Sequence, residues 1–201
     1  MSTSSSAMTA LNPSVRERIL AAARTEFATH GLRASSVRSI GARAGVTAAM
    51  INYYFGGKRP LYDVIVEEAQ ARLLTSVEEA LRGGREGDLP ARLTGAYFDF
   101  LAREHDFQRL LLREVLDRGE GVSGFVHRYV VPLRTLFEDL FGRDDSAFQS
   151  VITLFGAVAG YFIYEPVLSE LLGQDAMSEE SLERRRRHVM DLAALLSRGE
   201  P

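Results

Sequence analysis

Two glycines and a threonine between Val37 and Tyr54 have the spacing of two short helices joined by a tight turn. Gly41 falls where the two helices would cross, and a close crossing requires a residue with no side chain. Gly45 follows four positions later, in a turn that needs a positive φ. Thr47 then begins the second helix, and its hydroxyl can either cap that helix or reach a phosphate. The apolar positions that such a pair packs into a shared core are Ile40, Ala44, Val46, Ile51 and Tyr54. The pattern predicts a helix-turn-helix, whose chemistry is contact with nucleic acid.

The charges divide along the chain in a way that fits such contact. Residues 1–60 hold eight basic and two acidic side chains, a formal charge of +6. Residues 61–201 hold 16 basic and 25 acidic side chains, a formal charge of −9. A basic amino-terminal segment is attracted to a polyanion, whereas the acidic remainder is repelled by it. The alternative is a chance fluctuation of charge in a short segment.

The sequence lacks the residues that disulfides, metal sites and enzyme catalysis need. Cysteine is absent, which excludes disulfides, thiolate metal sites and cysteine nucleophiles. The four histidines, His30, His105, His127 and His188, are far apart in the sequence and form no metal-ligand pair. The sequence contains no phosphate-binding glycine loop, nucleophile elbow or zinc signature. We therefore expect no catalytic residues, no metal and no cofactor.

No segment has the pattern of a membrane span or a secretion signal. No apolar stretch approaches the roughly 20 residues that cross a bilayer. Residues 1–12 are rich in small and hydroxyl side chains, without a basic and then apolar order, and we expect a disordered tail there. These features predict a cytoplasmic protein with no membrane partner.

The elements that must hold the helix-turn-helix are all predicted to be helical. Apolar residues at helical spacing, with glycine and proline marking where helices begin and end, predict an all-α protein of about nine helices. The first would end at His30–Gly31, and a long one would run from Lys58 to Leu81. Pro90 would lie in the first turn of the fifth, and Pro132 would kink the seventh or mark an irregular turn in it. The expected helices span approximately 15–30, 37–44, 48–53, 58–81, 89–101, 106–117, 122–141, 144–172 and 178–197.

Residues 14–64 carry a resemblance to a known family. Arg16–Gly31 reads RERILAAARTEFATHG, and VRSIGARAGVTAAMINYYFGGKRPLY follows from Val37. An alanine-rich helix ending in Phe-x-x-x-Gly, then the helix-turn-helix, then an aromatic pair ahead of Lys58 resembles the DNA-binding domain of the TetR/AcrR family of transcriptional regulators. That resemblance implies a fold of nine or ten helices, of which the first three bind DNA and the rest dimerise and hold a small ligand. The carboxy-terminal segments DFLAREHDFQRLLLREVL and GYFIYEPVLSELLG are loosely similar to the subgroup that contains the pyrimidine-utilisation regulator.

The resemblance also implies which residues contact DNA. Tyr53 or Tyr54 matches an aromatic residue that touches the DNA backbone, and Lys58 matches a lysine that contacts phosphate. A cation and free N–H groups at a helix start both favour a phosphate oxygen. The predicted DNA-binding residues are Ser36, Val37, Thr47, Ala48, Ala49, Asn52, Tyr53, Tyr54 and Lys58.

The predicted recognition helix departs from the family pattern at Asn52, where an aromatic residue is usual. The amide of Asn52 can pair with an adenine edge in the major groove, or it can bond only to phosphate. Ala48 and Ala49 are small, so base reading would depend on few side chains, on methyl contacts or on DNA shape. Arg59 stands where the family usually has an acidic residue.

The second half of the chain is predicted to dimerise. Phe148–Leu172 is apolar on nearly all sides, which predicts burial against both the domain core and a second subunit. With the last helix it would form the four-helix seam of a twofold homodimer, as in the family. Arg184–Arg187 would point around most of a helix and pair with the preceding glutamates, which favours a salt-bridged surface over a second nucleic-acid patch.

A ligand pocket is predicted between the middle helices. Its candidate residues are Phe98, Phe107, Arg109, Arg113, His127, Tyr161 and Tyr164. Ordinary core packing is the alternative explanation of the aromatic residues, and surface exposure that of the arginines. A buried arginine would indicate an anionic ligand.

Taken together, the sequence predicts a ligand-responsive transcriptional repressor that a small-molecule effector releases from a palindromic double-stranded DNA operator. Residues 13–57 would form the DNA-binding domain, and residues 58–201 the ligand-binding and dimerisation domain. Two alternatives are a small-molecule-binding helical dimer without specific DNA function and a helical enzyme.

Overall fold

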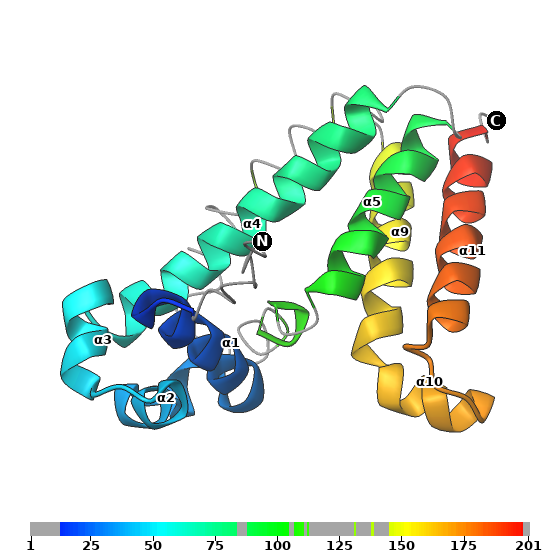
Figure 1. Ribbon diagram of the computed structural model, residues 1–201. Coiled ribbons are helices and arrows are strands. Elements are labelled where there is room, and N and C mark those ends of the chain that lie inside the picture. The colour runs from blue at the N-terminus through cyan, green and yellow to red at the C-terminus, as the bar shows by residue number, and fades with distance from the viewer. Residues whose placement is uncertain are drawn as a thin grey trace, which may run out of the picture. The chain divides into compact units, whose positions relative to one another are not determined.

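The computed structural model describes residues 13–83, 88–104, 107–110 and 145–198, together with positions 112, 131 and 138. These residues contain helices and no strand, which confirms the all-α prediction (Figure 1). The eight helices with assigned bounds are α1 (Val15–Ala34), α2 (Val37–Ala44), α3 (Ala48–Phe55), α4 (Lys58–Arg82), α5 (Leu89–Arg103), α9 (Asp145–Ile163), α10 (Glu165–Leu172) and α11 (Glu179–Arg198). The helices predicted near 106–117 and 122–141 lie largely outside the described residues.

The chain forms two compact units, residues 1–63 and 64–201. Helix α4 begins in the first unit and continues into the second. The first unit thus includes buried Leu61 and Tyr62 from the first turns of α4, while the domain division after residue 57 stays a prediction.

The first unit is built on α1, which begins with a reciprocal cap. The Ser14 hydroxyl accepts from the Glu17 N–H, and the Glu17 carboxylate accepts from the Ser14 N–H at 2.7 Å. Those bonds hold the pKa of Glu17 below its ordinary value. Helical geometry is interrupted at Gly31, whose φ of 75° is left-handed, so the predicted stop at Gly31 is confirmed although the last turn continues to Ala34.

Apolar side chains from all four helices fill the core of this unit. Phe27 of α1 is fully buried and meets Tyr62 of α4 edge to face, with ring centroids 5.5 Å apart. The other large buried members are Ile19, Leu20, Ile40, Ile51 and Leu61.

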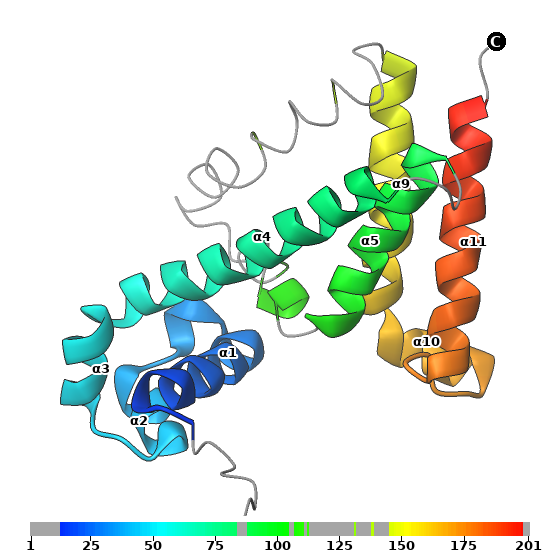
Figure 2. The same cartoon turned by 45° about the horizontal axis from the view of Figure 1, so that its top comes forward.

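In the second unit, α5 packs against α9 and α11, and both views show the three helices side by side (Figures 1 and 2). Pro90 lies in the first turn of α5, as predicted, and Asp88 caps that turn. Gly95 permits the close approach of α11, because a Cβ there would lie 2.9 Å from Met190 Sδ. The core includes Phe98, Leu101, Leu154, Val158, Val189 and Ala193.

The apolar stretch from 144 to 172 was expected to be one helix, and this expectation was wrong. It divides at Tyr164 into α9 and α10, which meet at 75°. Pro166 lies in the first turn of α10, where it fits a new helix start and cannot continue the old one. Among the described residues, no single helix combines the length and the hydropathy of a membrane span. Phe148–Ile163 and Glu165–Leu172 reach that hydropathy only as a bent pair.

Candidate nucleic-acid interface

The helix-turn-helix has the backbone geometry that its glycines predict. Gly45 ends α2 with φ 67° and ψ 37°, in the left-handed region that favours glycine. A Cβ on Gly41 would lie 2.8 Å from the carbonyl oxygen of Val46, so a side chain there would collide with the turn. The predicted roles of both glycines are confirmed.

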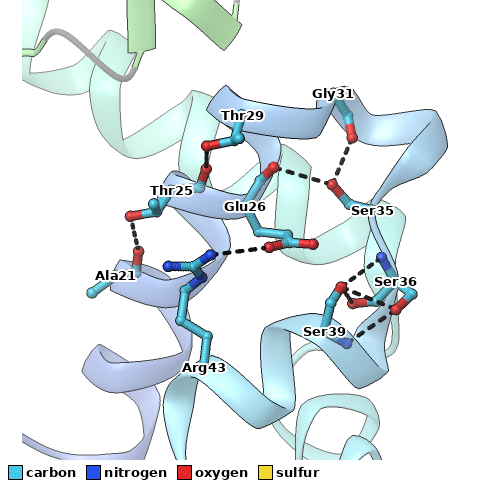
Figure 3. A network of polar contacts seen from close by, with 9 residues as sticks. All are labelled: Ala21, Thr25, Glu26, Thr29, Gly31, Ser35, Ser36, Ser39 and Arg43. Carbon is cyan, nitrogen blue, oxygen red and sulfur yellow. Dashed lines mark hydrogen bonds and ion pairs between the residues drawn. The ribbon is translucent and has the colours of Figure 1, made fainter.

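Hydroxyl side chains cap both helices of the motif. The Ser36 Oγ accepts from the Ser39 N–H at 3.0 Å, and the Ser39 Oγ accepts from the Ser36 N–H at 3.2 Å (Figure 3). The Thr47 Oγ1 accepts from the Met50 N–H at 3.3 Å. Thr47 therefore caps α3, which supports the first of its two predicted roles.

Helix α3 presents polar and aromatic side chains to solvent. Ile51 is fully buried and holds α3 on the core, whereas Asn52 is exposed and Tyr53 is 84% exposed. The rings of Tyr53 and Tyr54 meet edge to face with centroids 5.3 Å apart. Tyr54 was expected in the shared core, but it is exposed: it follows buried Ile51 on the same side of α3 and stands next to the end of the helix at Phe55.

The remaining predicted DNA-binding residues lie on the same two helices. Ala49 is exposed on α3, and Ala48 is half-buried in its first turn. Ser36 is exposed at the start of α2, and Val37 beside it is half-buried. The structure thus places all of these candidates on the α2 and α3 starts or on the outer face of α3.

Lys58 points into the first unit rather than away from it. Its Nζ donates to the carbonyl oxygen of Ser35 at 2.8 Å and to that of Arg33 at 3.3 Å. Both carbonyls belong to the segment that joins α1 to α2. The sequence motif did not reveal this contact, which joins residues 23 and 25 positions apart.

A buried carboxylate joins α1 to α2, and sequence reasoning missed it. The Glu26 side chain is 7% exposed and lies 3.6 Å from the Arg43 guanidinium (Figure 3). The only available signal was that Glu26 is one of two acidic residues in a strongly basic segment. Arg43 therefore neutralises a buried acid, while Arg33 and Arg38 are exposed cations of the same unit.

Two protein-family models match most of the chain. Residues 19–65 match "Bacterial regulatory proteins, tetR family", and residues 91–193 match "Tetracyclin repressor-like, C-terminal domain". The second match alone spans half of the chain. The chain belongs to the TetR family. The predicted resemblance is confirmed, and the similarity to the pyrimidine-utilisation subgroup stays a prediction.

Individual relatives of this TetR-family chain match it in part. The probable HTH-type transcriptional regulator YttP of Bacillus subtilis is 27% identical over 128 residues, 62% of either chain. The HTH-type transcriptional activator FasR of Mycolicibacterium smegmatis is 32% identical over 94 residues, 46% of this chain and 42% of FasR. The matched part thus spans less than two thirds of either relative.

A solved structure shows the same fold. The transcriptional regulator FadR of Bacillus subtilis, crystallised with stearoyl-CoA, superposes with a TM-score of 0.67 at 16% identity. The superposition covers 88% of this TetR-family chain and 96% of FadR.

The predicted ligand residues of the TetR-family body are only partly brought together. Phe98 and Tyr161 are buried with ring centroids 6.2 Å apart, and burial raises the pKa of Tyr161. The Tyr161 hydroxyl donates to the Ala176 carbonyl at 2.5 Å, and Phe107 packs edge to face on Phe100. These contacts fit core packing, the alternative reading of the aromatic residues.

Two other predicted ligand residues, Arg109 and Tyr164, do not join this cluster. Arg109 and Tyr164 are exposed, whereas Arg113 and His127 lie outside the described residues. A cavity of about 750 Å³ lies instead between α4, α5 and α11. Its charged and hydroxyl lining residues are Ser76, Glu79, Arg92, Asp99, Arg103 and Arg186. None of the predicted ligand residues that the structure describes lines it.

The arginine run of α11 points in several directions, as predicted. Arg184 pairs with Glu180 at 2.9 Å, and Arg187 pairs with Glu183 at 3.3 Å, each one turn away. The other two reach neighbouring helices, which the prediction did not include. Arg186 forms two bonds with Asp99 of α5, at 2.8 and 3.0 Å, and Arg185 donates to the Ala157 carbonyl of α9 at 2.7 Å.

Proposed function

We propose that this TetR-family chain is a homodimeric transcriptional repressor that leaves a palindromic DNA operator when a small molecule binds its second unit. The observation that carries the proposal is the outer face of α3, where Asn52 and Tyr53 are exposed on a helix anchored by buried Ile51. A short helix held by a capped turn, with polar tips directed outward, fits the DNA major groove.

Twofold pairing would place two such helices on one duplex. Each α3 would enter the major groove of one half-site, with half-sites one helical turn (~34 Å) or a multiple apart. Ser36 and Val37 at the start of α2 would meet phosphate and fix the register.

Helix α9 supplies the surface that supports a dimer. Phe148, Ile152 and Phe155 follow one another at helical spacing and are 54%, 48% and 59% exposed. Leu195 of α11 is also exposed. Exposed apolar stripes of this kind mark protein interfaces, and a second copy of the chain is the occupant that family membership supports.

Release from DNA requires an effector that distinguishes two dimer geometries. A ligand that binds both geometries equally well shifts nothing, however tight its binding. Because the FadR structure of similar fold contains stearoyl-CoA, acyl-CoA thioesters are the first effectors to test. The proposed location is the cytoplasm, where the proposed operator lies.

One alternative is a helical small-molecule-binding dimer without DNA function. The 84% exposure of Tyr53 on a short helix favours DNA binding, because an unused helix face gains nothing from an exposed aromatic ring. Every relative described above is a regulator of transcription, and none is described as an enzyme.

The deciding experiment is selection of duplexes from a random DNA library by the full-length chain, followed by titration of the selected duplex. We expect a palindromic motif, a stoichiometry of two chains per palindrome and release by one member of an acyl-CoA panel. Equal affinity for the selected and for scrambled duplexes at 150 mM salt would contradict the DNA function. Release by no effector would leave a repressor and contradict only the ligand response.

A further inference from the structure

The junction between α1 and α2 is held from two sides at Ser35. On one side, the Ser35 N–H donates to the Gly31 carbonyl at 3.2 Å, and its hydroxyl donates to the same carbonyl at 2.6 Å. On the other side, the Ser35 carbonyl accepts from the Lys58 ammonium at 2.8 Å. Ser35 is 3% exposed, its bond to Gly31 is buried and its bond to Lys58 is partly buried, so an unpaired carbonyl here would be costly.

The ammonium group suits this place better than a guanidinium would. Its three N–H bonds diverge from one nitrogen, so one nitrogen can donate to the carbonyls of both Arg33 and Ser35. A guanidinium is a flat fork that fits carboxylate and phosphate, and it is wider than the space one nitrogen fills. The chain has 23 arginines and uses lysine only at position 58. We read this single exception as the result of that geometric demand.

The junction leads directly into the first turn of α2. Ser36 caps this helix, and Val37 and Arg38 occupy its first turn, where backbone N–H groups have no partner within the helix. Such N–H groups, together with the helix dipole, form the part of α2 suited to a DNA phosphate. A shift of Ser35 would move the Ser36 cap and with it these donors.

We propose that Lys58 is a positioning residue, which anchors the Ser35 carbonyl and thereby sets the first turn of α2 against a DNA phosphate. The inference deepens the proposed DNA function and rests on it for the final step. It differs from the expectation, drawn from the family resemblance, that Lys58 itself contacts phosphate.

The absence of cysteine allows a test that keeps the charge and removes the N–H donors, with methyl groups in their place. In Lys58→Cys the new thiol is the only thiol of the chain and therefore the preferred site of alkylation. Alkylation with 2-bromoethylamine yields a lysine analogue with three N–H donors. Alkylation with (2-bromoethyl)trimethylammonium yields the same positive charge with no donor. Labelling in denaturant before refolding avoids dependence on the stability of the unlabelled variant.

The first measurement uses the labelled protein without DNA. We expect the aminoethyl form to reproduce the native amide chemical shifts of Ser36, Val37 and Arg38, and the trimethyl form to shift them. We also expect the trimethyl form to lower the Tm of the first unit by about 4 °C or more. Identical shifts and Tm for the two forms would overturn the anchoring role.

The second measurement is affinity for the selected operator across a range of salt concentrations. Because both forms carry one charge, we expect the same slope of log affinity against log salt. We also expect the trimethyl form to bind about tenfold more weakly at each salt concentration. Equal affinities would overturn the positioning role.

Arg59→Cys, labelled in the same two ways, is the matched control. Arg59 is exposed on the next position of α4, where its guanidinium pairs with Asp63 at 3.3 Å. A loss of affinity for the trimethyl form at both positions would attribute the effect to the label and overturn the inference. If no form binds DNA, the proposed function fails, while the first measurement still decides the anchoring of Ser35.

Discussion

Glu26 and Arg43 join the first two helices of the DNA-binding unit through an ion pair of unequal exposure. The carboxylate on α1 is 7% exposed, and the guanidinium on α2 is 48% exposed, with 3.6 Å between Glu26 Oε2 and an Arg43 terminal nitrogen. The Ser35 hydroxyl, whose one hydrogen has the Gly31 carbonyl as its nearer acceptor at 2.6 Å, also lies 3.3 Å from the Glu26 carbonyl oxygen, so the same turn of α1 also contacts the α1–α2 junction (Figure 3). Arg43 thus belongs to the structure of the helix-turn-helix, although its charge resembles that of a DNA contact.

Replacing Arg43 with alanine should destabilise the first unit, because it leaves the buried Glu26 carboxylate without its neutralising partner. The expected loss in free energy of unfolding is about 1–3 kcal/mol, measured by urea denaturation. Arg33→Ala, which removes an exposed charge from the same unit, should cost less than about 0.5 kcal/mol. A double variant with Glu26→Gln should recover part of the loss, and no recovery would contradict this account.

Replacing Gly41 with alanine should force the turn of the motif apart. The new Cβ would lie 2.8 Å from the Val46 carbonyl oxygen, and backbone atoms cannot move aside as a flexible side chain can. We expect a destabilisation of about 1–3 kcal/mol by thermal unfolding. Gly45→Asn is the control. Asparagine tolerates positive φ, and a Cβ added at Gly45 would have no non-neighbouring atom within 4 Å. Equal losses for the two variants would show that backbone conformation, rather than the collision, governs Gly41.

Replacing Asn52 with alanine separates its two possible contacts with DNA. If the amide reads an adenine edge, selection from random duplexes should lose stringency at one base position in each half-site, a cost of about 1–3 kcal/mol there. Tyr53→Phe, on the neighbouring exposed position, should keep the selected motif. An unchanged motif with uniformly weaker binding would instead assign Asn52 to phosphate.

Replacing Ile152 with glutamate should prevent pairing through α9. A charge in the exposed apolar stripe would be buried in the dimer without a partner. We therefore expect the dissociation constant of the dimer to rise at least tenfold. Sedimentation velocity at micromolar concentration measures the dimer fraction, and the affinity for the operator should fall with it. Thr153→Glu, exposed on the same helix but about 100° or more around it from each residue of the stripe, introduces the same charge away from the stripe and should leave dimerisation unchanged. A dimeric Ile152→Glu protein would place the interface elsewhere.

Local features of the first unit were predictable because their causes lie within a few residues of one another. Gly45 ends α2 since positive φ is a property of the residue itself, and Thr47 caps α3 through a bond to Met50 three positions later. The single-helix expectation for 144–172 failed at Tyr164, because hydrophobicity alone does not indicate where one apolar helix ends and the next begins. Pro166 was the local signal for that turn.

The sequence alone determined the helical class, the helix-turn-helix and the family, since these depend on short-range periodicity, glycine positions and a contiguous motif. Only the tertiary structure decided which charged side chains form contacts that hold the fold together. Lys58 contacts a carbonyl 23 residues away, Arg43 an acid 17 positions earlier, and Arg186 an acid 87 residues away. Such partners are chosen by how helices pack, because an ion pair or hydrogen bond forms only where packing brings its two groups within reach.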